Sequence, residues 1–210
     1  MRTTKLLIIA LLSTCFSFSA QAQVRLSEEE KETLKVAVKN KLDFFQDQLT
    51  LIAARRAGAE PKEQAVKATL ALFIGKGEPY TVYENGREVK NTGVKMQTSS
   101  VNRSSKRTLL MKSYLRWLKN QTTYSDILIE SADAVKIGEI FPERSTGRYY
   151  STATICQHFV GYRDGYRVYE DYTVKTVKIY IEREVVDLPD GELTVWKIQL
   201  ADITTVDTWR

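Results

Sequence analysis

The sequence predicts an α+β domain in which three helices of the N-terminal half pack on a curved, mostly antiparallel sheet of four to six strands. Between Ser27 and Leu118, three segments repeat apolar residues at steps of three and four, which is typical of amphipathic helices. After Tyr124, apolar and β-branched residues alternate with polar ones between turn residues, which is typical of strands. Helices followed by a run of strands indicate the α+β class, because the apolar face of such a sheet needs covering.

The first helix is expected to begin after Ser27, because a serine followed three positions later by Glu30 matches a capping box. Its apolar stripe consists of Leu34, Val38, Leu42, Phe45, Leu49 and Ile52. Gly58 and Pro61 interrupt this pattern. A second helix follows from about Pro61, a residue that suits the first helical turn, and stops at Gly75.

Shorter elements are expected between the second helix and Tyr124. Residues 80–83 alternate as a strand does, and Asn85-Gly86 after them is a strong signal for a tight hairpin turn. Residues 94–98 predict another strand. Ser104 or Ser105 then caps a third helix, whose stripe contains Leu110, Tyr114 and Trp117.

The part of the chain after Tyr124 predicts four long strands joined as a meander. Its turn signals lie at 142–147, at Asp164-Gly165 and at 189–191. Apolar residues change phase within the second strand of the central hairpin, from Val168, Tyr172 and Val174 to Val177, Ile179 and Ile181. A β-bulge near Lys175-Thr176 would reconcile the two phases and bend the sheet.

No repeat or linker divides the chain, so residues 23–210 are expected to form a single domain. The order of its elements resembles that of the nuclear transport factor 2-like superfamily, with a cystatin-like α+β sheet as neighbour. The resemblance spans Ser27 to Thr208 and depends on element order, not on a motif. It implies a cone-shaped fold with a pocket at its open end, into which acid or histidine side chains project in isomerases, cyclases and dehydratases of the superfamily.

Residues 1–22 have the pattern of a secretory signal peptide. Arg2 and Lys5 precede an apolar run, and small residues precede a cleavage site expected after Ala22. The run is too short for a stable transmembrane helix, and no later stretch is long enough. We therefore expect export to the periplasm or the outside of a Gram-negative bacterium, with lipidation at Cys15 as an alternative.

Composition excludes several classes of function. Loss of Arg2 and Lys5 lowers the count of Lys and Arg from 31 to 29 against 26 Asp and Glu, and a mature net charge of +3 does not indicate a nucleic-acid partner. Cys156 is then the single cysteine, so no intramolecular disulfide forms. No cluster has metal-ligand spacing and no cofactor motif is present, so neither a metal nor a cofactor is expected.

A histidine and an aspartate are predicted to face each other in the central hairpin. If Asp164-Gly165 forms a two-residue turn, His158 lies opposite Asp171. The two side chains could form a catalytic dyad. The alternative is a solvent-facing ion pair that contributes about 0.2–1 kcal/mol.

Asp202 is the best candidate for a catalytic base. Pairing across Asp190-Gly191 sets Arg183 against Ile198 and places both Arg183 and Asp202 on an otherwise apolar face. Burial there would raise the pKa of Asp202 and make it a proton acceptor. The resemblance implies a pocket lined by Tyr114, Trp117, Arg183, Trp196 and Asp202. Alternatively, Asp202 caps a turn or pairs with Arg183.

Seven of the eleven tyrosines lie between Tyr149 and Tyr180. Tyr162, Tyr166 and Tyr169 could form a surface that stacks on a carbohydrate or anchors a partner protein. The alternative is that tyrosine is favoured at half-exposed strand positions.

These observations leave three functional hypotheses. The first is an exported, non-catalytic binding module for a small ligand or an envelope partner protein. The second is a small-molecule isomerase or dehydratase that uses Asp202. The third is a structural role in the envelope as a homodimer joined through the open sheet face.

Overall fold

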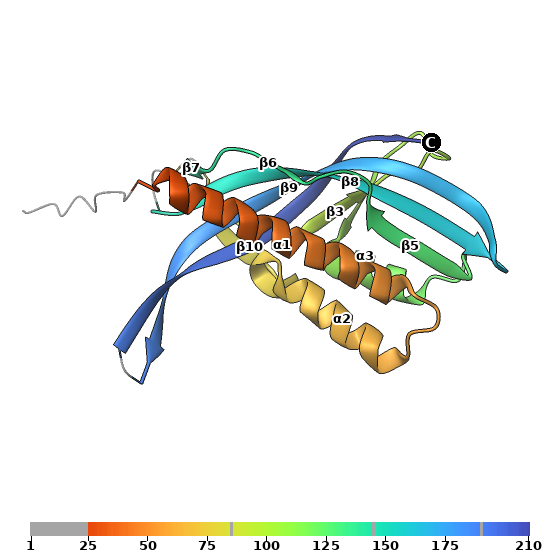
Figure 1. Ribbon diagram of the computed structural model, residues 1–210, viewed down its shortest axis with the longest axis horizontal. Coiled ribbons are helices and arrows are strands. Elements are labelled where there is room, and N and C mark those ends of the chain that lie inside the picture. Colours follow the sequence, from red (N-terminus) through yellow and green to blue (C-terminus); the bar gives the residue numbers. More distant parts are fainter. Residues whose placement is uncertain (1–24, 85, 144–145, 190) are drawn as a thin grey trace, which may run out of the picture.

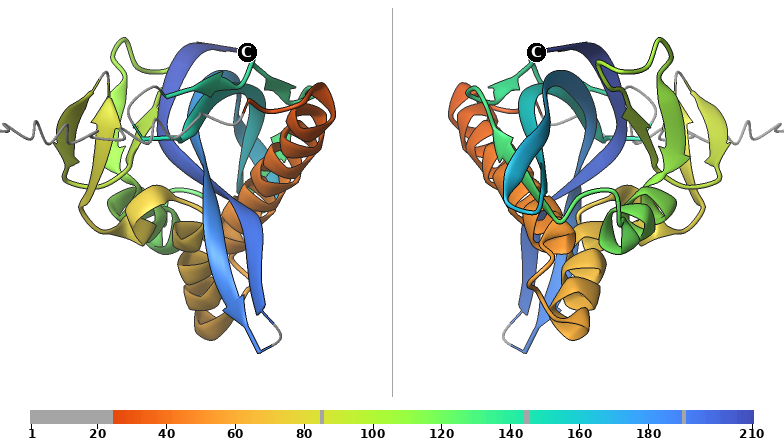
Figure 2. Two further views of the ribbon diagram at one scale, coloured as in Figure 1. Left: turned by 90° about the vertical axis from the view of Figure 1, so that its left-hand side faces the viewer. Right: turned by 90° about the vertical axis from the view of Figure 1, so that its right-hand side faces the viewer.

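The computed structural model describes residues 25–84, 86–143, 146–189 and 191–210. Three helices lie against one side of a long, strongly curved sheet whose strands arch over them (Figure 1). Views from the two ends show the same curvature, with the helices beside the hollow of the sheet (Figure 2). The predicted α+β class with a mostly antiparallel sheet is confirmed. The predicted signal peptide, including Cys15 and the cleavage site at Ala22, lies outside the described residues.

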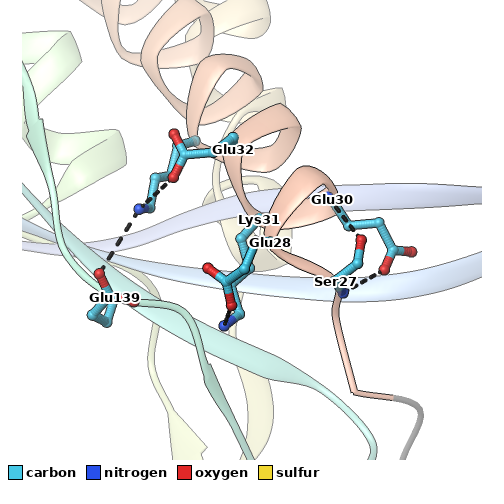
Figure 3. Close-up of polar contacts among 7 residues, drawn as sticks. Ser27, Glu28, Glu30, Lys31, Glu32 and Glu139 are labelled. Carbon is cyan, nitrogen blue, oxygen red and sulfur yellow. Dashed lines mark hydrogen bonds and ion pairs between the residues drawn. The ribbon is translucent and has the colours of Figure 1, made fainter.

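Helix α1 (Glu28–Ala53) has the predicted N-terminus and the predicted buried stripe. Ser27 Oγ accepts a hydrogen bond from the Glu30 backbone N–H at 3.1 Å, and the Glu30 carboxylate accepts one from the Ser27 N–H at 2.8 Å (Figure 3). The capping box is therefore formed as predicted. Phe45 is fully buried at the centre of the stripe and packs edge-on against Phe73 with ring centroids 5.4 Å apart.

Helix α2 (Ala59–Ala71) begins two residues before Pro61, which lies in its first turn, and the chain leaves it through the 3-10 turn η1 (Ile74–Gly77). Helix α3 (Met111–Asn120) begins later than predicted. The prediction of a cap at Ser104 or Ser105 is wrong, because residues 107–110 form strand β4 (Arg107–Leu110) and pair with β3 (Lys95–Thr98). Pairing with a neighbouring strand overrides the helical pattern of this segment.

Six strands form a continuous path through the sheet in the order β4-β3-β10-β9-β8-β5, and two short strands, β6 (Lys136–Ile137) and β7 (Phe141–Pro142), also pair with β8. The predicted meander consists of β5 (Asp126–Ser131), β8 (Tyr149–Arg163), β9 (Tyr166–Leu188) and β10 (Gly191–Trp209). All of its strands are antiparallel, whereas β10 and β3 are parallel. Strands β1 (Tyr80–Glu84) and β2 (Arg87–Asn91) form the predicted separate hairpin.

The turn between β8 and β9 is formed by Asp164 and Gly165 as predicted, with Arg163 opposite Tyr166. One bulge between Gly161 and Tyr162 then shifts the register by one residue. A shift of one residue exchanges the two faces of every later pair. The predicted pairing of His158 with Asp171 is therefore wrong, and His158 lies opposite Tyr172.

The predicted bulge near Lys175-Thr176 is also wrong, because β9 and β8 keep one register from Tyr169 to Ile181. The irregularities lie instead in β10, between Leu200 and Ile203 and between Thr205 and Asp207. The inner face of β9 changes from polar to apolar along the strand. Its buried residues are Asp171, Thr173, Lys175, Val177, Ile179 and Ile181.

Pairing between β9 and β10 differs from the prediction by two residues. Arg183 lies opposite Trp196, and Ile181 lies opposite Ile198. An even shift leaves the β10 side chains up to Leu200 on their predicted face, whereas the irregularity after Leu200 shifts the register by one residue and exchanges the faces from Ile203 to Thr205. No helix in the described part of the chain is long and apolar enough to cross a bilayer.

Candidate functional site

Of the five residues predicted to line one pocket, Tyr114 contacts Trp117 and Arg183 contacts Trp196. On α3, Tyr114 is buried and Trp117 is half exposed, with ring centroids 6.0 Å apart. Arg183 lies over the Trp196 ring at 4.7 Å, two residues beyond Ile181, the last β9 residue that pairs with β8. The pocket predicted to be common to all five side chains therefore stays a prediction.

Asp202 lies at the irregularity of β10 between Leu200 and Ile203. Its Oδ1 accepts a hydrogen bond of 2.8 Å from the backbone N–H of Lys95, the first residue of β3. A bulged strand leaves backbone groups unpaired, and a short carboxylate side chain can satisfy such a group. The structure thus gives Asp202 a role in joining β10 to β3.

His158 is held between two glutamates instead of facing Asp171. Its Nδ1 lies 3.0 Å from Glu130 on β5, its Nε2 lies 2.8 Å from Glu170 on β9, and its ring stacks on Tyr172 at 4.4 Å. Desolvation lowers the pKa of His158, but the hydrogen bonds to the two carboxylates outweigh it and raise the pKa above its ordinary value. The imidazole therefore links β8 to both β5 and β9.

We expect this histidine to make stability depend on pH. Because the folded-state pKa is raised, the contribution is fully present below the unfolded-state pKa of about 6.5 and is lost as the pH rises through the folded-state value. His158→Gln should lower the free energy of unfolding by about 0.5 kcal/mol at pH 5.5 and by less at pH 8.5. Urea unfolding of both proteins at the two pH values measures this, and an equal loss at both would contradict it.

Asp171 and Lys175 belong to a buried polar network on the inner face of β9, and each is 4% exposed. Lys175 Nζ donates to the Gln97 backbone carbonyl at 3.1 Å, while Asp171 accepts a hydrogen bond from the Tyr169 hydroxyl. Burial lowers the pKa of Lys175 to about 8, against the attraction of Asp171. Burial likewise raises the pKa of Asp171, against its hydrogen bonds to Tyr169 and Thr173. Desolvation thus outweighs the attraction between the two charges.

The predicted surface of three tyrosines is not formed. Tyr166 at the β8–β9 turn is 77% exposed, but Tyr162 and Tyr169 are only partly exposed. The Tyr169 hydroxyl lies 2.7 Å from Ser100 Oγ and also bonds Asp171, so it belongs to the buried network. The prediction that Tyr169 faces a partner is wrong, because the Gly161 bulge places it on the inner face.

A groove of about 330 Å³ lies where the α1–α2 connection, the segment after α3 and the β8–β9 turn meet. Three cationic side chains line it: Arg55, Lys62 and Arg163. The other lining residues are Ala53, Gln121, Thr122, Thr123, Tyr124, Ser125 and Asp164. A hollow with several cations and many amide and hydroxyl groups suits an anionic ligand.

The cationic side chains of the groove are not neutralised by acidic neighbours. Among the described residues, Arg55 and Lys62 form no ion pair, and Arg163 Nη2 donates to the Thr123 carbonyl at 3.2 Å. Lys62 lies in the first turn of α2, whose N-terminal backbone N–H groups carry partial positive charge. Asp164 is the single acidic residue in the lining. The groove is therefore electropositive.

Tyr124 forms the wall between this groove and the buried network. Its ring packs against Phe159 and Tyr169 at centroid distances of 5.8 and 6.1 Å. A Cβ at Gly161 would come within 2.5 Å of the Tyr124 ring, so only glycine fits beneath it. Gln121 Oε1 accepts a hydrogen bond from the Tyr124 N–H at 3.0 Å and holds the segment after α3 in place.

Sequence reasoning missed the groove because its residues come from three distant segments. No local pattern links Arg55 and Lys62 to Arg163, and the closest signal is the turn at Asp164-Gly165, whose strands return the chain to the helices. Among the described residues, no group of histidine, cysteine, aspartate and glutamate side chains could hold a metal ion.

Comparison with known proteins finds no matching family model, no matching curated protein and no matching solved structure. The resemblance to the nuclear transport factor 2-like superfamily therefore stays a prediction from element order.

Proposed function

We propose that this protein is an exported, non-catalytic binding module that holds a small carboxylate- or phosphate-bearing ligand in the groove lined by Arg55, Lys62 and Arg163. The observation that carries the proposal is the convergence of these three cations on one hollow that contains a single acid. Charge-assisted hydrogen bonds to a carboxylate or phosphate are about twice as strong as neutral ones. Export follows from the signal-like pattern of residues 1–22.

The size and position of the groove support a small ligand. Its volume of about 330 Å³ is near the lower end of the range of about 300–1,000 Å³ for small-molecule sites. Amide and hydroxyl groups of Gln121, Thr122 and Thr123 stand beside the cations and can fix the orientation of a ligand. The catalytic alternative gains no support, because the Asp202 carboxylate accepts a hydrogen bond from the Lys95 N–H.

The proposal predicts where an anion binds. In a ¹H–¹⁵N NMR titration with citrate and, separately, inorganic phosphate, the largest shifts are expected at the amides of Thr122, Thr123 and Asp164. Arg55→Gln and Lys62→Gln should each weaken binding about tenfold, the equivalent of one charge-assisted hydrogen bond. Arg163 is not substituted in this experiment, because its side chain also donates a hydrogen bond to the Thr123 carbonyl.

Lys67→Gln is the matched control, because it removes the same charge from an exposed position on the same helix. It should leave the affinity for citrate and phosphate unchanged. The proposal fails if neither anion shifts the groove amides, or if Lys67→Gln weakens binding as much as Lys62→Gln does.

A further inference from the structure

A second hollow lies between α1 and the edge strand β5. Its volume is about 420 Å³. It is lined by Asp43, Gln46, Asp47, Thr50, Leu128, Ile129, Glu130 and Ser131. The Thr50 hydroxyl donates to the Ile129 carbonyl and so fastens α1 to the edge of the sheet at this point. We call this hollow the α1–β5 cleft.

Gln46 gives the α1–β5 cleft a polar group without a partner. The residue is 3% exposed, and its Nε2 and Oε1 are both buried with no hydrogen-bond partner among the described residues. Buried amide groups nearly always have partners, since their desolvation is otherwise uncompensated. A glutamine inside the apolar stripe of α1 therefore indicates that a ligand with hydrogen-bonding groups reaches the cleft.

The charge of the cleft is opposite to that of the groove. Asp43, Asp47 and Glu130 are its ionisable lining residues, and no cation lines it. Asp43 is paired with Lys39 at 2.6 Å, and Glu130 with His158 at 3.0 Å, whereas Asp47 forms no ion pair in the described part of the chain. At least one carboxylate is thus available to a cationic ligand.

We propose that the α1–β5 cleft binds an alkylammonium group. Leu128 and Ile129 provide apolar surface for a methylene chain, the Asp47 carboxylate can bind the ammonium, and the Gln46 Oε1 can accept one of its N–H groups. The site is independent of the anion groove, because the two hollows share no lining residue. An alkylammonium group can come from a free diamine or from a lysine side chain.

Isothermal titration of the mature protein with cadaverine and with the peptide acetyl-Gly-Lys-Gly-amide tests this proposal. We expect saturable binding of at least one of them. Asp47→Asn should weaken it about tenfold, as should Gln46→Met, which keeps the side-chain size but removes the amide. Tighter binding of cadaverine assigns the cleft to free diamines, and tighter binding of the peptide assigns it to lysine side chains.

Two controls separate a binding role from a structural one. Asp187→Asn removes the same charge from an exposed position on β9 and should not change the affinity for either amine. Gln46→Met should keep or raise the free energy of unfolding in urea, since it removes an unpaired buried amide. Absence of saturable binding to both amines overturns the proposal, as does unchanged binding in both Asp47→Asn and Gln46→Met. Lys62→Gln, which disables the anion groove, should leave amine binding intact.

Discussion

Asp171→Ala is expected to lower the free energy of unfolding by about 3 kcal/mol at pH 7, because it removes the negative charge that attracts the buried ammonium of Lys175. The Tyr169 hydroxyl also loses its acceptor in this variant. Urea unfolding followed by tryptophan fluorescence measures the loss.

A double-mutant cycle tests whether the loss comes from the charge on Lys175. Lys175→Met alone should change stability little, because removal of the buried ammonium offsets the loss of its hydrogen bond to Gln97. The double variant Asp171→Ala/Lys175→Met should then regain most of the roughly 3 kcal/mol that Asp171→Ala alone loses. If the two single losses simply add, the charges are not coupled.

The lowered pKa of Lys175 also makes the free energy of unfolding depend on pH, in a direction that can be stated. Burial lowers the pKa of Lys175 to about 8 from an ordinary value of 10.5, so the unfolded chain binds more protons between these values. Stability therefore rises with pH in this window, by up to about 3 kcal/mol for a shift of this size. Because Lys175→Met cannot show this rise, the difference between wild type and variant isolates it from other titrating groups.

Gly161→Ala is expected to lower the free energy of unfolding by about 3 kcal/mol and to weaken anion binding in the groove. The new Cβ would lie 2.5 Å from the Tyr124 ring, so the ring must leave its contacts with Phe159 and Tyr169. Since Tyr124 lines the groove, its displacement changes the wall of the binding site. Urea unfolding and the citrate titration measure the two effects.

Tyr124→Leu provides the second variant for this prediction. A smaller, flexible side chain can make room for the new methyl group, so Gly161→Ala should be much less destabilising in a Tyr124→Leu background than in the wild type. An equal loss in both backgrounds would show that the destabilisation does not come from the contact with Tyr124.

Local patterns were sufficient for the elements whose signals lie within a few residues. Ser27 and Glu30 determine the start of α1 through their own hydrogen bonds, and the two-residue turn at Asp164-Gly165 depends only on a conformation that these residues tolerate. The stripe that includes Phe45 was also predictable, because a helix buries residues at a fixed period.

Side-chain placement in the sheet was predictable only where the register is regular. The bulge beside Gly161 moves Asp171 and Tyr169 to the inner face and leaves His158 on the other. The Tyr124 ring occupies the space over Gly161, and this contact between distant segments has no local signal in the sequence. A shift of one residue in register moves every later side chain to the opposite face of the sheet. The predictions of the dyad and of the tyrosine surface are therefore wrong for the same reason.

The sequence by itself determined the α+β class, the helical stripes and the hairpin turns, because each depends on neighbours in the chain and on a backbone period. Only the tertiary structure decided the register beyond Gly161, the burial of Lys175 and the convergence of Arg55 and Lys62 with Arg163. These features depend on contacts between segments far apart in the chain. The residues that make such contacts show no periodic pattern from which the contacts could be predicted.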